Sequence, residues 1–218
     1  MIALVRYQFT VLLLSQRYLA PLLLFLGLVA VLTSSDTGPL AATYASVAGA
    51  TLLCSVWLTM ALVGLDDPAH RSIVVVSAGS HLRVLLGTVG AAAVWCLLLT
   101  AAGLVLPLIF GSHAPGVADL VLGVEAQLTC AFAGMAIGLV CSRLVFRRQG
   151  HALVLALVLL LAVLLGKGLS PVNIMLTDLH GTSDSVEALM PTGVSLAAAA
   201  GLLATGVAVT QAITLRKG

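Results

Sequence analysis

Long runs of apolar residues, separated by short polar breaks, divide the chain into six segments. Each run has about 20 residues, the length that a helix needs to cross roughly 30 Å of hydrocarbon. Backbone amides that face lipid must find hydrogen-bond partners within their own segment, so the runs are expected to be helices. The predicted fold is all-α, a polytopic membrane protein with six transmembrane helices: Tyr18–Ser34, Ala41–Leu65, Val84–Phe110, Ala118–Ser142, His151–Ser170 and Thr192–Leu215.

Basic residues are concentrated at alternate breaks between these runs. Cytoplasmic loops of membrane proteins retain Lys and Arg, so this pattern predicts that both the N- and the C-terminus are cytoplasmic. Lys167 is the exception, and its long stem would reach the headgroups from near the outer end of the fifth run. The remaining nine basic residues are Arg6, Arg17, Arg71, Arg83, Arg143, Arg147, Arg148, Arg216 and Lys217.

The composition agrees with a single transmembrane domain over residues 1–218. The chain is 61% hydrophobic and only 8% charged, whereas a soluble domain carries about 25% charged residues. Its arginines are divided among short loops and form no continuous basic stripe, which excludes nucleic acid as an expected partner. We expect no metal site or disulfide, because the four cysteines lie inside apolar runs without ligand spacing: Cys54, Cys96, Cys130 and Cys141.

Residues 2–17 form a separate predicted element before the first run. Arg6, Thr10 and Arg17 lie close to one helical face, and apolar side chains cover much of the rest. This pattern is typical of an amphipathic helix lying in the cytoplasmic interface. Pro21 offers a place for the chain to bend. The alternative is that this segment extends the first transmembrane helix inward.

The cytoplasmic loop 66–83 carries the clearest local signals. Asp66-Asp67-Pro68 reads as a helix N-cap with Pro at the first helical position, and Gly79 can end that helix in a left-handed conformation. A short helix with an apolar face in such a loop favours docking into a groove on another protein; insertion into the interface is the alternative. The residues expected to couple to this partner are Asp66, Asp67, Pro68, His70, Arg71, Ile73, Val74 and Val75.

Uncharged polar residues follow one face of the second run. Tyr44, Thr51, Ser55 and Thr59 are spaced by 7, 4 and 4 positions, and such a stripe can line a pathway for an amphipathic cargo. Hydrogen bonding between helices is an equally good interpretation. Glu125, about two turns into the fourth run, is added to the predicted pathway as part of an outer vestibule.

Two further segments have an expected structural role. In the fourth run, small residues recur at intervals of four, a ridge suited to close helix packing: Ala126, Cys130, Gly134 and Gly138. The outer segment 171–191 is long for a turn. It is expected either to hold one or two short helices that re-enter the outer leaflet or to be an ordinary loop.

The sequence contains no pattern of an enzyme that works alone. Gly166-Lys167-Gly168 lacks the upstream glycine and the following Ser or Thr of a Walker A motif, so the chain is not expected to bind ATP itself. No arrangement of paired carboxylates, or of a nucleophile with its base, lies within the apolar runs. We therefore expect a non-enzymatic membrane subunit.

Two stretches resemble the membrane subunit of a type-2 ABC transporter, of the exporter class. Arg6–Phe9 with Ser15–Leu23 is similar to the interfacial helix that leads into the first span of that family. Asp66–Ser80 with Leu82–Gly87 is similar to its coupling-helix loop. In topology the resemblance covers the whole chain. It indicates the class of transporter but does not indicate which cargo is carried.

The resemblance implies a permease in the bacterial cytoplasmic membrane that exports an amphipathic or hydrophobic substrate by alternating access. Two copies, or one copy and a sibling permease, would pair in the lipid bilayer. ATP and Mg would be bound by separate ATP-binding subunits, with no cofactor in this chain. The alternatives are a non-transporting scaffold, a proton-coupled carrier and a haem-handling permease of cytochrome c maturation, although the His pair or tryptophan-rich motif that would support the last is lacking.

Overall fold

Helices account for every regular element in the computed structural model, which describes residues 2–34, 40–65, 74–77, 79–110, 116–142, 149–166, 168, 170–181 and 185–217. The all-α prediction is thereby confirmed for this part of the chain. The helices are α1 (Ile2–Ser15), α2 (Leu19–Ser34), α3 (Leu40–Val63), α5 (His81–Phe110), α6 (Val117–Val140), α7 (Gln149–Leu165), α8 (Pro171–Gly181) and α9 (Ser185–Lys217).

Four of these helices are long and apolar enough to cross a membrane: α3, α5, α6 and the stretch Ala188–Leu215 of α9. The bent pair of α1 and α2, with 79° between them, makes a fifth if it is counted as one span. The 17 residues of α7 extend about 25 Å, which is less than the roughly 30 Å of a hydrocarbon core. Four or five apolar helices indicate a multi-pass membrane protein, and the six spans remain a prediction.

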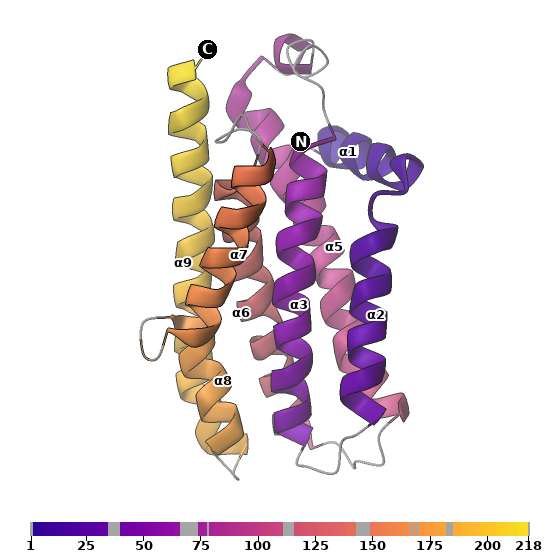
Figure 1. Ribbon diagram of the computed structural model, residues 1–218, viewed down its shortest axis with the longest axis vertical. Helices are drawn as coiled ribbons and strands as arrows, with labels where there is room; N and C mark the ends of the chain where they lie inside the picture. The colour runs from indigo at the N-terminus through magenta and orange to yellow at the C-terminus, as the bar shows by residue number, and fades with distance from the viewer. Residues whose placement is uncertain are drawn as a thin grey trace.

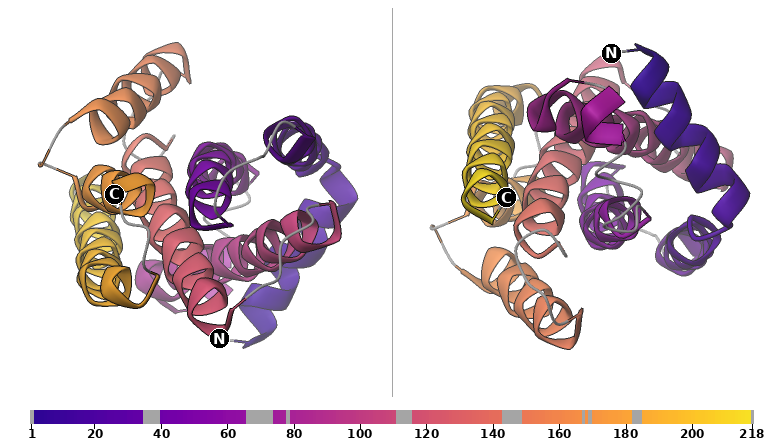
Figure 2. Two further views of the ribbon diagram at one scale, coloured as in Figure 1. Left: turned by 90° about the horizontal axis from the view of Figure 1, so that it is seen from below. Right: turned by 90° about the horizontal axis from the view of Figure 1, so that it is seen from above.

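The helices lie side by side in an elongated bundle, with α1 lying across one end (Figure 1). We call this the α1 end, and the opposite end, where α8 lies, the α8 end. α6 occupies the middle of the bundle and packs most extensively against α3 and α9. Seen along the bundle, α7 stands at the periphery (Figure 2). The described chain begins and ends at the α1 end.

The contact between α1 and α5 depends on two glycines of α5. A Cβ atom at Gly87 would lie 3.1 Å from the Cβ of Leu4, and one at Gly90 would lie 2.9 Å from a methyl group of Val5. Further along α5, the ring of Trp95 stacks on Phe9 and on Tyr18, at centroid distances of 5.3 and 4.9 Å. These contacts hold α1 across the bundle, at a steep angle to α2.

A short connection joins α7 to α8. The side chain of Ser170 accepts a hydrogen bond from the backbone N–H of Val172 (3.3 Å), and Pro171 occupies the first position of α8. The side chain of Asn173 donates to the carbonyl of Leu164 at the end of α7 (2.6 Å), so it satisfies a backbone oxygen that the helix leaves free. The segment 171–191 therefore contains α8 and the first turns of α9.

Candidate functional site

Only part of the predicted coupling loop lies within the described residues. Asp66, Asp67, Pro68, His70, Arg71 and Ile73 lie outside them. Val74 and Val75 belong to a helical turn, residues 74–77, at the α1 end of the bundle (Figure 1). Both side chains are half-buried, while Val76 is 82% exposed.

Gly79 ends this helical turn as the sequence predicts. Its φ of 70° lies in the left-handed region, which an L residue with a side chain rarely adopts. Its backbone N–H donates to the carbonyl of Val75 at 2.9 Å, as in a helix that ends with a left-handed residue. This termination fixes where the chain leaves the turn and enters α5.

The predicted polar stripe of α3 lies against the predicted small-residue ridge of α6. Tyr44, Thr51, Ser55 and Thr59 are each no more than 1% exposed. A Cβ atom at Gly134 would lie 2.8 Å from the carbonyl of Leu52, and in the same place it would collide with Ser55. The structure thus brings the two sequence patterns together in one close helix contact. Thr51 of the stripe donates across it to α6, while the hydroxyls of Ser55 and Thr59 donate to carbonyls of α3 itself. The role of the stripe in a cargo pathway stays a prediction.

Buried polar atoms gather where α3, α5 and α6 meet. The hydroxyl of Thr51 donates to the side-chain oxygen of Gln127, and the amide nitrogen of Gln127 faces Gly103, where a Cβ atom would lie 2.9 Å away. Among the described residues, that nitrogen and the hydroxyls of Tyr44 and Thr100 have no hydrogen-bond partner. The sequence-based predictions do not include Thr100 and Gly103. A polar and a small residue within the apolar run Val84–Phe110 are the signal that could have indicated a contact between helices here.

Glu125 connects α6 with α9 near the α8 end. The hydroxyl of Thr192 donates to Oε2 of Glu125 at 2.6 Å. Thr192 is buried and the carboxylate side chain is half-buried. Glu125 therefore faces α9, whereas the four residues of the polar stripe belong to α3 and pack against another side of α6. The hydrogen bond links α6 to α9.

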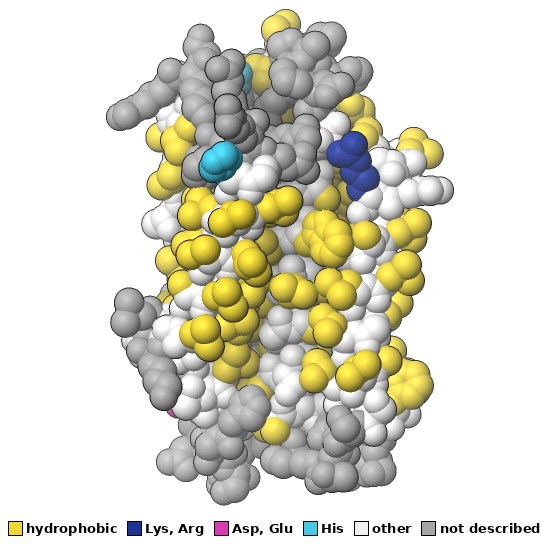
Figure 3. Space-filling model, viewed as in Figure 1, with side chains coloured by type: hydrophobic (Ala, Val, Ile, Leu, Met, Phe, Trp, Pro, Cys, Tyr) yellow, Lys and Arg dark blue, Asp and Glu magenta, His cyan; other side chains and the backbone are white. Residues whose placement is uncertain are grey.

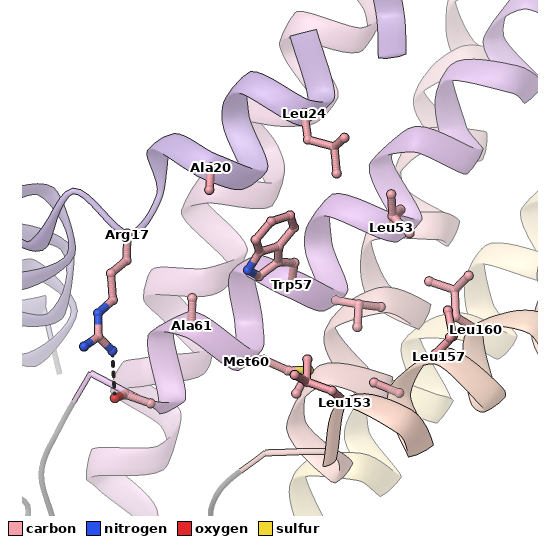
Figure 4. A pocket seen from close by; sticks show the side chains of 13 residues that line it. Arg17, Ala20, Leu24, Leu53, Trp57, Met60, Ala61, Leu153, Leu157 and Leu160 are labelled. Atoms are coloured by element: carbon pink, nitrogen blue, oxygen red, sulfur yellow. Dashed lines mark hydrogen bonds between the residues drawn. The ribbon is translucent and has the colours of Figure 1, made fainter. Parts of the chain in front are cut away.

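A groove opens on the side of the bundle between α2, α3 and α7. Its volume is about 820 Å³. Hydrophobic side chains cover this face of the molecule (Figure 3). Arg17 lies at one end of the groove and donates through Nη1 to the carbonyl of Gly64 at 3.3 Å (Figure 4). The sequence places Arg17 in the predicted interfacial helix and in the charge pattern that sets the orientation, and it does not predict the groove, because the groove is formed by helices that are distant in the chain.

The described residues offer no obvious metal centre. Nowhere among them do three or more His, Cys, Asp or Glu side chains come together in a way that could hold a metal ion. All four cysteines are free thiols buried within the bundle. Their small, polarizable side chains fill space between helices.

Comparisons with protein-family models, with curated proteins and with solved structures give no match. The similarity to type-2 ABC permeases therefore depends on the residues quoted from the sequence.

Proposed function

We propose that this protein is the permease subunit of an ATP-driven exporter in a bacterial cytoplasmic membrane. In this proposal the chain has six transmembrane helices, with α7 as the fifth, and the α1 end faces the cytoplasm. It pairs with a second permease and with two ATP-binding subunits. An amphipathic or hydrophobic cargo crosses as the helices alternate between inward-open and outward-open arrangements.

The observation that carries the proposal is the helical turn 74–77, between α3 and α5. It presents Val76, 82% exposed, at the end of the bundle where α1 also lies. An exposed apolar side chain on a short helix outside the bundle suits a groove on a partner protein. Movement of this turn would act on two long helices at once, because α3 ends before it and α5 begins after it.

The arrangement of α1 supports the same proposal. It lies at 79° to α2, and Arg6 and Thr10 are exposed on it. An interfacial helix would lie in this way, nearly parallel to the membrane surface, with its arginine toward anionic headgroups. The packing of α1 on α5 would also link the interface to the helix that follows the coupling turn.

The test uses the tagged chain, purified in mild detergent from membranes of its own host, with Mg-ATP hydrolysis measured in the eluate. We expect a Walker A protein and ATPase activity to co-purify with the wild-type chain. Val76→Asp should lose both, because a charge would have to be desolvated in the partner's groove. A wild-type chain that purifies without ATPase activity would contradict the proposal.

Val117→Asp is the matched control. Val117 is 80% exposed, almost as much as Val76, but it lies at the first turn of α6, at the α8 end. An acidic residue at a helix N-terminus is tolerated or mildly stabilising. This variant should retain the ATPase, and if it lost as much as Val76→Asp the effect would not report on the coupling turn.

A non-transporting scaffold is the second candidate, because all four hydroxyl-bearing residues of the α3 stripe are buried against α6. A scaffold needs these residues only for packing between helices. The same purification distinguishes the two: a scaffold would co-purify with other membrane proteins, and the eluate would hydrolyse no ATP.

A further inference from the structure

The groove between α2, α3 and α7 has the length of one membrane leaflet. Along α3, its lining extends from Gly64 to Leu53, 11 residues apart, which corresponds to roughly 16 Å of helix. Half of a hydrocarbon core is about 15 Å. With α3 placed across a membrane, the groove would begin at the α1 end and stop near the middle of the bilayer.

Its chemistry changes from one end to the other. The walls are apolar along the whole length and include Leu24, Trp57 and Leu160, while Arg17 at the α1 end is the one charged residue among the described residues of the lining (Figure 4). Arg17 belongs to the turn between α1 and α2. Its hydrogen bond to Gly64 holds the guanidinium over the mouth of the groove. A guanidinium has five N–H donors, so this bond leaves donors available for a phosphate.

We propose that the groove binds an anionic phospholipid from one leaflet, with its phosphate on Arg17 and one acyl chain between α3 and α7. The apolar walls would contact the chain. The guanidinium suits a phosphate in charge and in geometry. This inference depends on the membrane placement of the bundle and not on ATP-driven export, so either test can fail without the other.

A helix from a second copy suits the groove less well. A transmembrane helix would need a groove about 30 Å long, roughly twice what Gly64 to Leu53 provides.

The bound lipid would also support α7. This helix packs mainly against α6 and α8, and its Leu153 and Leu157 are more than half exposed. Both side chains line the groove. An acyl chain between them and Trp57 would fill the space that separates α7 from α3.

Tryptophan fluorescence can test this proposal, because the chain has two tryptophans in different surroundings. Trp57 lines the groove and is 45% exposed, whereas Trp95 is 8% exposed and stacked between aromatic rings. Trp95→Phe leaves Trp57 as the reporter. This variant is reconstituted in phosphatidylcholine vesicles that contain a small fraction of brominated phosphatidylglycerol or, for comparison, of brominated phosphatidylcholine.

We expect brominated phosphatidylglycerol to quench Trp57 more strongly than brominated phosphatidylcholine. Arg17→Gln should reduce the preference for the anionic lipid roughly five-fold, since one basic residue near an anionic headgroup contributes about that factor. Arg17→Lys should retain part of it. Arg6→Gln removes an exposed charge at the same end that does not line the groove, and it should leave the preference unchanged.

Equal quenching by the two lipids in the Trp95→Phe protein would overturn the proposal. So would an effect of Arg6→Gln as large as that of Arg17→Gln, because the attraction would then belong to the whole surface. If Trp95→Phe does not fold, the proposal is tested by native mass spectrometry, which counts the phosphatidylglycerol molecules retained by the wild-type protein and by Arg17→Gln. The wild type should retain one more lipid than the variant, and equal numbers would contradict the assignment.

Discussion

A Cβ atom at Gly138 of α6 would lie 2.7 Å from the Cβ of Thr59 on α3. The same atom would lie 2.9 Å from the carbonyl of Val56. Backbone and Cβ atoms cannot turn aside as the end of a flexible side chain can. The distance between α3 and α6 is therefore set by the absence of a side chain at this position, as it is one turn earlier at Gly134.

Gly138→Ala should destabilise the protein in detergent by about 1–3 kcal/mol, the usual range for overpacking a tight contact. The expected mechanism is separation of α3 from α6. Thermal unfolding followed by circular dichroism measures the effect. Gly201→Ala on α9 is the control, since a Cβ atom there meets nothing within 4 Å, and it should leave stability unchanged or raise it by up to about 1 kcal/mol.

The contact between Thr51 and Gln127 should contribute a small but measurable coupling energy. The hydroxyl of Thr51 donates to Gln127, and both side chains are fully buried. Hydrogen bonds between transmembrane helices average about 0.6 kcal/mol in double-mutant cycles. A cycle built from Thr51→Val and Gln127→Met should give a coupling energy near that value, and a value indistinguishable from zero would mean that the two side chains act independently.

The bond from Thr192 to Glu125 should hold α9 against α6 near the α8 end. Thr192→Val removes the donor from a half-buried carboxylate, and hydrogen bonds to charged groups are worth about 1.5–3 kcal/mol. We expect a loss of stability toward the lower part of that range, because solvent still reaches Glu125. Glu125→Gln, which keeps an acceptor oxygen, should lose less.

Thr177→Val is the matched control for this prediction. Thr177 is exposed on α8, and its hydroxyl donates to the carbonyl of Asn173 within the same helix (2.8 Å). An exposed substitution of this kind usually changes stability by no more than about 0.5 kcal/mol. Equal losses for the two threonines would show that the link to Glu125 adds nothing.

The sequence predicts the helices much better than their contacts. The runs Ala41–Leu65 and Ala118–Ser142 differ by only one or two residues at each end from α3 (Leu40–Val63) and α6 (Val117–Val140). Such runs are recognisable because lipid requires about 20 apolar residues and internally satisfied backbone groups. The left-handed turn at Gly79 was also predictable, because glycine adopts that conformation without strain.

Two boundaries differ from the prediction for local reasons. The fifth run was expected to reach Ser170, but α7 ends at Leu165, and Gly168 has a φ of 72°. α9 begins at Ser185 and continues without a break through Pro191, where the prediction ended the outer segment 171–191, expected to hold either short helices or a loop. Hydropathy does not distinguish an apolar loop from an apolar helix, and a proline within a membrane helix is tolerated where neighbouring groups satisfy the backbone.

The pairing of helix faces was beyond sequence reasoning. A helix surrounded by apolar environment on every side has no polar face to indicate its outside. The stripe containing Ser55 and the ridge containing Gly134 were each recognised, but nothing in the sequence indicated that they contact each other. The groove beside Arg17 could not be predicted either, because it forms only where α2, α3 and α7 come together.

The proposed export mechanism requires that the turn 74–77 lies on the cytoplasmic side, where an ATP-binding subunit can hold it. Cysteine accessibility tests it most directly, since all four native cysteines are buried. Val76→Cys and Val117→Cys are placed separately in the chain and exposed to a membrane-impermeant maleimide in intact cells. We expect labelling at position 117 from outside and at position 76 only after the membrane is opened. Labelling of position 76 in intact cells would contradict it.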